Sequence, residues 1–258
     1  MALNAAVAPT PLLPLEQCLP DDGLAGTLIA RVWNPAAGLR GGPCVAVLRG
    51  DGVFDLGRAA PTVSALLEAE DPVALVRATA GERLCGVGEL FAASLRRDEA
   101  GLRLLAPCDL QVIKAAGVTF AASLLERVIE EHTRGDPARA HTVRQWVSAQ
   151  LGGSLASIQP GSEKAQELKE LLIKQGLWSQ YLEVAIGPDA EVFTKAPVLS
   201  AVGMGAEIGI HPASEWNNPE PELLLAVDSR GRICGARPGN GVNLRGFGPQ
   251  RTLVLLNG

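Results

Sequence analysis

Pro219-Glu220-Pro221-Glu222-Leu-Leu-Leu-Ala-Val227 is the most informative segment of the chain, and it is followed by Asp228-Ser-Arg-Gly231. The short apolar run predicts a strand that leads into a turn. Residues two apart in a strand point to the same face, so Glu220 and Glu222 are expected to project together. Neighbouring carboxylates repel each other unless a cation lies between them, and hard cations prefer oxygen ligands and keep several waters. The segment therefore predicts that Glu220 and Glu222 together bind a Mg²⁺ or Mn²⁺ ion.

A second interpretation of this segment stays open from spacing alone. Proline is tolerated at the first residue of a strand, so Pro219 to Glu222 can also be the solvated, charged beginning of a strand with no metal.

Composition narrows the class of protein. The chain has 258 residues, enough for a sizeable core and one or two domains, and 47% of them are hydrophobic. The formal net charge is -5, and no cluster of basic residues favours a nucleic-acid partner. The aromatic content of 4% argues against platforms for stacking bases.

Cysteine usage and the N-terminal residues bear on localisation. The five cysteines are scattered without a metal-binding spacing, which predicts reduced thiols in a cytoplasmic protein. The apolar N-terminus is interrupted by Pro9, Pro11 and Pro14, lacks a basic region and makes a poor signal peptide. No apolar run reaches membrane-spanning length, so no membrane partner is expected.

The first part of the chain predicts a small β-rich domain, residues 1–105. Short strands are expected at 27–33, 44–48 and 53–56, separated by turn-rich residues. A helical pattern begins at Val63 and continues through Val76. No catalytic constellation is apparent in this region.

The second part, residues 106–258, begins with a strand near 111–120 and continues with helices expected at 121–131, 138–150 and 163–175. From residue 184 the pattern changes to short strands and turns. Helices grouped early and strands grouped late predict an α+β fold.

Five segments in this order resemble the fumarylacetoacetate hydrolase superfamily, and most closely its bacterial branch that acts on 2-keto-3-deoxy sugar acids. The resemblance extends over about residues 105 to 245. It implies a mostly β catalytic domain, a mixed β-roll, with an inserted helical segment. The segments are Gly117-Val-Thr-Phe-Ala-Ala-Ser-Leu-Leu-Glu-Arg127, Val192-Phe-Thr-Lys-Ala-Pro197, Gly203-Met-Gly-Ala-Glu207, Pro219 to Val227 and Gly239-Asn-Gly-Val-Asn-Leu-Arg245.

The resemblance also implies a set of metal ligands. Glu220 and Glu222 match the glutamate pair of the family, but Gly241 stands where the family has a third ligand, an aspartate. Read locally, Gly239-Asn240-Gly241 predicts a tight turn, because Asn-Gly readily adopts positive φ. Both interpretations leave no third carboxylate there, so the metal is expected to bind weakly or in an incomplete site.

Three further residues receive roles from the resemblance. Ser123 stands where the hydrolytic branch has a basic histidine, and a serine needs an activating partner to act as a base near neutral pH. Glu126 is retained and could itself move a proton, which fits dehydration better than hydrolysis of a carbon–carbon bond. Lys195 matches a residue that meets the anionic substrate. Otherwise Glu126 is an exposed helix residue and Lys195 a solvated loop lysine.

The function implied by the resemblance is Mg²⁺-dependent dehydration of a 2-keto-3-deoxy sugar acid through a metal-stabilised enolate. Two alternatives stay open: hydrolysis of an acylpyruvate or diketo acid, and a catalytically inactive member of the family. The family also implies a homodimer and a small 2-oxo acid as substrate. The resemblance decays after Leu244, which predicts a chain truncated at its C-terminus relative to the family.

Overall fold

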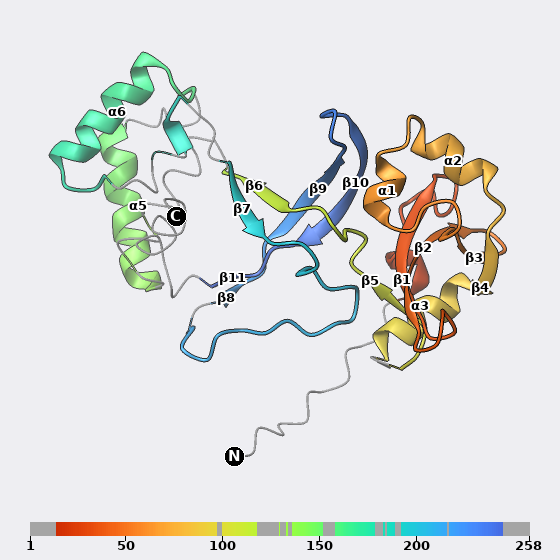
Figure 1. Cartoon of the computed structure of the whole chain (residues 1–258). Coiled ribbons are helices and arrows are strands. Elements are labelled where there is room, and N and C mark those ends of the chain that lie inside the picture. The colour runs from red at the N-terminus through yellow and green to blue at the C-terminus, as the bar shows by residue number, and fades with distance from the viewer. Residues whose placement is uncertain are drawn as a thin grey trace. The chain divides into compact units, whose positions relative to one another are not determined.

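The computed structural model describes residues 14–96, 100–117, 129, 133, 136–151, 158–178, 183, 185–188, 192–215 and 217–244. Two compact units make up the chain, and each is described by itself (Figure 1). Unit 1 comprises Met1–Val112 and Ala196–Gly248, and unit 2 comprises Ile113–Lys195 and Pro249–Gly258. The described elements combine a five-stranded antiparallel sheet with a few helices, which is consistent with the predicted α+β class.

A five-stranded antiparallel sheet forms the centre of unit 1, with strand order β4-β3-β2-β1-β5. The predicted N-terminal strands are confirmed to within two residues. The strands are β1 (Leu28–Asn34), β2 (Gly42–Arg49), β3 (Gly52–Asp55), β4 (Glu82–Cys85) and β5 (Arg103–Leu105), and the helical elements are η1 (Leu15–Gln17), α1 (Val63–Leu67), α2 (Pro72–Ala78) and α3 (Val87–Leu95).

The predicted helical pattern that begins at Val63 is confirmed, and it is divided into two short helices. α1 ends at Leu67, and α2 begins anew at Pro72, whose missing N–H costs nothing at the first helical position. Asp71 caps α2 by accepting the N–H of Ala74 at 2.9 Å. The Asp-Pro pair was the local signal of the break.

Both faces of this sheet are buried. One face packs with α3 into a cluster that includes Val32, Ala46 and Leu90, and the other packs with α1 and α2 around Val45 and Leu66. Successive residues of β2 therefore enter opposite clusters, and β2 carries five consecutive buried residues. This two-sided burial is the largest apolar core among the described residues.

After the chain re-enters unit 1 at Ala196, its segment Gly203-Met204-Gly205 packs closely against earlier residues of that unit. Met204 packs against the α3-side cluster. A Cβ added at Gly203 would lie 2.2 Å from the carbonyl oxygen of Leu104, and one at Gly205, where φ is +82°, would lie 2.6 Å from that of Ser94. Only glycine allows these close approaches of backbone to backbone.

A long antiparallel hairpin follows, formed by β9 (Pro221–Val227) and β10 (Ile233–Asn240) (Figure 1). The predicted strand after Pro219 is thus confirmed. The short strands β8 (Asn217–Asn218) and β11 (Asn243–Leu244) flank the hairpin in sequence and pair with each other. Ala226 and Cys234 pack one face of the hairpin against the cluster beside α1.

The tip of the hairpin is fixed by Asp228, whose side chain is fully buried. Its carboxylate accepts the backbone N–H groups of Arg230 (2.9 Å) and Arg232 (2.8 Å) and both Nε–H groups, at 3.1 and 2.7 Å. The two guanidinium groups in turn donate to carbonyl oxygens of residues 68–70, directly after α1. We call this arrangement the Asp228 clamp.

Ionisation of Asp228 depends on the same contacts. Burial opposes the charged form, but the hydrogen bonds from Arg232 and Arg230 outweigh it and hold the pKa of Asp228 well below its usual range. Glu68 reinforces the joint by accepting the N–H and hydroxyl of Ser229, at 2.7 and 2.6 Å, which lowers the pKa of Glu68. The clamp therefore stays ionised near neutral pH.

The elements with described bounds in unit 2 include two helices and a pair of strands. The predicted helices at 138–150 and 163–175 are confirmed as α5 (Pro137–Leu151) and α6 (Glu163–Lys174), and Ser162 caps α6 as expected. Strands β6 (Ile113–Ala116) and β7 (Val192–Ala196) pair with each other. Most of the expected helix 121–131 lies outside the described residues.

In the described part of residues 106–258, the strands form three two-stranded sheets. A mixed β-roll and a single catalytic domain over 106–258 stay predictions. None of the helices in the described ranges combines the length and apolar character that crossing a bilayer requires.

Candidate functional site

The two predicted metal ligands lie at the open end of the β9–β10 hairpin, away from its tip in sequence. Glu222 is the second residue of β9, pairs with Gly239 of β10 and is exposed. Glu220 lies directly before β9 and is half-buried. The hairpin thus brings both carboxylates to one end of one element.

Glu220 is held by two asparagines. Its backbone N–H donates to the side-chain oxygen of Asn240 at 3.0 Å, and the Asn243 amide donates to its carboxylate at 3.4 Å. Its carbonyl accepts the N–H of Gly241 at 3.0 Å. Hydrogen bonds to a carboxylate and its backbone restrict its orientation, as outer contacts do for metal ligands.

The tight turn expected at Gly239-Asn240-Gly241 is wrong. Gly239 and Asn240 are the last residues of β10 and pair with β9, and none of the three has positive φ. Pairing across the hairpin therefore overrides the local Asn-Gly preference. An added Cβ at Gly239 would lie 2.1 Å from the end of the Leu224 side chain, which would have to move to accommodate it.

The donors at this end suit only part of a metal site. Glu220 and Glu222 offer carboxylate oxygens of the kind that Mg²⁺ prefers, and Mg²⁺ commonly keeps several waters beside one or two carboxylates. Gly241 offers no side chain. Within the residues that the structure describes, no group of three or more His, Cys, Asp or Glu side chains is arranged to hold a metal.

Of the other predicted site residues, the structure describes Lys195. Lys195 lies in β7 of unit 2 and is half-buried, whereas Glu220 and Glu222 belong to unit 1. On the neighbouring strand, Lys114 donates to the hydroxyl of Thr194 at 2.7 Å. Ser123 and Glu126 lie outside the described residues, so their roles stay predictions.

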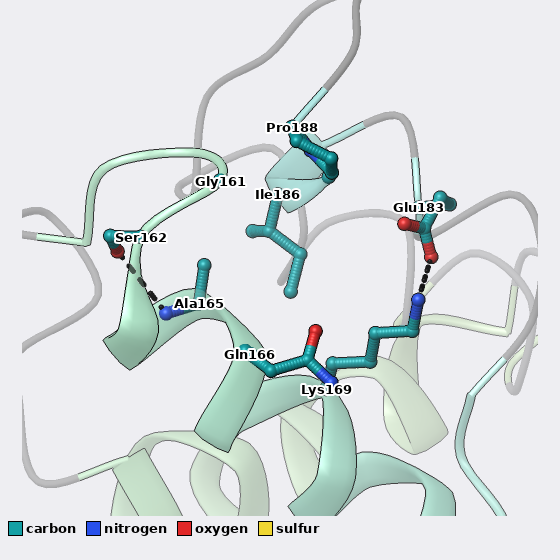
Figure 2. A pocket seen from close by; sticks show the side chains of 9 residues that line it. Gly161, Ser162, Ala165, Gln166, Lys169, Glu183, Ile186 and Pro188 are labelled. Carbon is teal, nitrogen blue, oxygen red and sulfur yellow. Dashed lines mark hydrogen bonds and ion pairs between the residues drawn. The ribbon is translucent and has the colours of Figure 1, made fainter.

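Unit 2 contains a small cleft of about 100 Å³ between α6 and the segment 183–188 (Figure 2). Lys169 and Glu183 form an ion pair of 2.7 Å at its side, and the Lys169 ammonium lies 5.1 Å from the ring centre of Trp178. Figure 2 shows Ile186 and Pro188 on the side opposite α6. The cation is already neutralised, and none of the predicted site residues lines this cleft.

Sequence reasoning missed the residues that position the candidate ligands. Asn240 and Asn243 lie 20 and 23 residues after Glu220. Their place in a segment that carries the resemblance was the available signal. The Asp228 clamp had no such signal, because its partners at residues 68–70 are about 160 positions away in sequence.

Comparison with known proteins gives two partial similarities. A "2-dehydro-3-deoxy-D-arabinonate dehydratase" of Saccharolobus solfataricus is 38% identical over 65 residues, which cover 25% of this chain and 22% of that protein. A "Probable 2-keto-3-deoxyxylonate dehydratase" of Haloferax volcanii is 39% identical over 75 residues, 29% of this chain and 26% of that protein. The chain thus spans about a quarter of the length of the curated relatives it matches.

No protein-family model matches the chain, and no solved structure matches it. Both relatives are named as dehydratases of five-carbon 2-keto-3-deoxy sugar acids. The predicted resemblance to 2-keto-3-deoxy sugar acid dehydratases is therefore supported by two partial similarities to proteins with such names, and the bacterial branch stays a prediction.

Proposed function

We propose that this chain contributes the acid-pair portion of a Mg²⁺- or Mn²⁺-dependent dehydratase of the fumarylacetoacetate hydrolase type, acting on a 2-keto-3-deoxy sugar acid. The observation that carries the proposal is the similarity to two proteins named as dehydratases of such acids. The carboxylate pair on the hairpin supports it independently, because the substrate class offers oxygen atoms that a hard cation binds.

Glu220 and Glu222 are the residues that would hold the cation. Bound there, a divalent cation would supply a Lewis acid for the 2-oxo and carboxylate oxygens of the substrate. Asn243 orients the Glu220 carboxylate, and Asn240 fixes its backbone. With only these two acidic donors at the open end of the hairpin among the described residues, we expect weak metal binding.

Dehydration of a 2-keto-3-deoxy acid removes a proton from C3 and a hydroxyl group from C4 and forms a double bond between them. The hydroxyl group leaves as water by taking up a proton, so a group that accepts the C3 proton and can return it to the leaving hydroxyl is required. We assign the acceptance of this proton to Glu126. Ser123, three residues earlier in the sequence, is assigned a hydrogen bond to the substrate. Lys195 is assigned to the substrate carboxylate, since an ammonium group attracts an anion without needing a fixed fork geometry.

The test incubates the full chain and Mg²⁺ with 2-keto-3-deoxypentonate and follows substrate and product by mass spectrometry. We expect a product lighter by one water, lost in Glu220→Gln and retained in Glu167→Gln, whose exposed side chain lies on α6. Equal turnover by both variants would refute the assigned ligands.

Two other outcomes separate the alternatives. Cleavage of an acylpyruvate into two acids, without loss of water from the pentonate, would favour a carbon–carbon hydrolase. No turnover of either substrate at saturating Mg²⁺ would overturn the enzymatic proposal and favour a catalytically inactive protein.

A further inference from the structure

A second cleft lies in unit 1, and none of the residues assigned to dehydration contributes to it. Its volume is about 210 Å³, enough for several waters or one small organic molecule. It lies among β1, β2, the two residues before α1, residues 109–110 and Leu199. The lining residues are Arg31, Pro43, Cys44, Val45, Pro61, Thr62, Asp109, Leu110 and Leu199.

Arg31 is the only cationic residue in this lining. It lies in β1 opposite Val45 of β2, and its side chain is only 15% exposed. The one polar interaction of the Arg31 side chain with the described residues is an ion pair with Asp109. The Nε atom lies 4.0 Å from the Asp109 carboxylate, beyond hydrogen-bonding distance. A guanidinium group has five N–H donors, and one so deeply buried ordinarily has acceptors for several.

Asp109 meets little of this need, because at 4.0 Å its carboxylate balances the charge of Arg31 without accepting a hydrogen bond from it. One oxygen accepts the N–H of Val63 at 2.7 Å. The other accepts the N–H groups of Ser64 and Leu110, at 3.0 and 2.8 Å, and the Ser64 hydroxyl. Asp109 thus serves chiefly to cap the beginning of α1, and the donors of Arg31 are left for another acceptor.

The remaining wall is mostly apolar, and one of its residues has an unusual backbone conformation. Leu199 has φ of +60°, and among the described residues it alone combines positive φ with a side chain. Its N–H donates to the carbonyl oxygen of Asp109 at 3.1 Å, which fixes this loop at the cleft. Left-handed backbone at a branched residue is unfavourable and is often found at ligand sites.

We propose that this cleft binds a small organic monocarboxylate. The carboxylate accepts two parallel N–H groups from Arg31, a geometry that guanidinium favours. A short aliphatic chain lies against Val45, Leu110 and Leu199. A doubly charged anion such as phosphate fits less well, because the ionised Asp109 lies near Arg31 and repels the additional charge.

The test titrates butanoate into the full chain and follows amide and arginine Nε–H signals by two-dimensional NMR, with butanamide as the uncharged probe. We expect saturable shifts at Arg31, Leu110 and Leu199 with butanoate and none with butanamide. Arg31→Met, which keeps most of the aliphatic stem, should weaken binding by roughly tenfold or more. Arg77→Met, which removes an exposed arginine outside the lining, should leave it unchanged.

A second variant guards against misfolding of Arg31→Met. Leu110 is 57% exposed, so Leu110→Glu should fold normally and should abolish butanoate binding by placing a carboxylate at the cleft. Equal responses to butanoate and butanamide, or undiminished binding in Leu110→Glu, would overturn the proposal. The proposal would also be overturned if the response to butanoate disappeared when the spectra were compared at equal ionic strength, set with chloride. A general salt effect would then explain the shifts.

Discussion

The N-terminal sheet and the β9–β10 hairpin belong to the same unit but are stabilised differently. In β2, neighbouring residues such as Val45 and Ala46 are both fully buried, one on each face. In β9, Leu223 is 72% exposed and Leu225 is 51% exposed. The opposite face, which carries Ala226, packs against the cluster beside α1. The sheet depends on apolar burial, whereas the hairpin depends largely on the hydrogen bonds of its tip.

This difference bears on function, because the proposed metal ligands lie on the weakly buried element. Segments with few buried apolar contacts open locally more easily than core strands. The Asp228 clamp compensates by fixing one end of the hairpin to the residues after α1. The following predictions test whether the two regions differ as described.

The largest effect is expected from a cavity in the sheet core. Leu66 is 1% exposed, so Leu66→Ala should lower the free energy of unfolding by about 2–5 kcal/mol. Leu225→Ala on the hairpin should change it by less than about 0.5 kcal/mol. Urea denaturation of both variants measures the contrast, and similar losses would show that the hairpin face is buried after all.

Asp109→Asn should destabilise unit 1 by about 2 kcal/mol, because it removes charged hydrogen bonds at the beginning of α1. Burial opposes the ionisation of Asp109, but hydrogen bonds from Ser64, Leu110 and Val63 outweigh it and lower its pKa below the ordinary 3.8. A depressed folded-state pKa stabilises the fold above pH 3.8, and that contribution is lost as pH falls further.

Urea unfolding at a series of pH values measures this contribution. The stability difference between the parent chain and Asp109→Asn should stay constant between neutral pH and about pH 5 and shrink below pH 3.8. A difference that grew on acidification would contradict the assigned hydrogen bonds.

Gly241→Asp should raise Mg²⁺ affinity by roughly tenfold, because it adds a third carboxylate next to Glu220. Gly241 does not have positive φ, so the aspartate is compatible with the backbone. Calorimetric titration measures the change, with Gly235→Asp, an exposed position of β10 with open space at its Cβ, as the matched control. Unchanged affinity in Gly241→Asp would count against a cation at this end.

Asp228→Asn should have the most local effect. It weakens the clamp, so amide exchange should accelerate at Leu224 and Ala226 in β9 while amides of β2 keep their protection. Hydrogen–deuterium exchange with mass spectrometry measures both strands in one experiment. Equal acceleration in β2 would mean that the clamp supports the whole unit rather than the hairpin.

Features that depend on neighbouring residues were predictable from the sequence. Alternation and turn residues gave the N-terminal strands, and Ser162 correctly marked the beginning of α6. The strand after Pro219 followed from its apolar run. In each case the determining residues lie within about one element of each other.

Features that depend on distant contacts were not predictable. The Asn-Gly turn failed because Gly239 and Asn240 pair with β9, and no local pattern places residues 196–248 in the same unit as the sheet. For the candidate site, the sequence identified Glu220 and Glu222. It did not reveal that Asn240 and Asn243 hold Glu220 in place.

The most direct test of the proposed site is Mn²⁺ binding to the full chain, followed by electron paramagnetic resonance. The double variant Glu220→Gln/Glu222→Gln is compared with the parent and with Glu167→Gln. We predict one saturable Mn²⁺ site in the parent and in Glu167→Gln, and its loss in the double variant. Equal Mn²⁺ binding by all three proteins would contradict the proposal that this acid pair holds the cation.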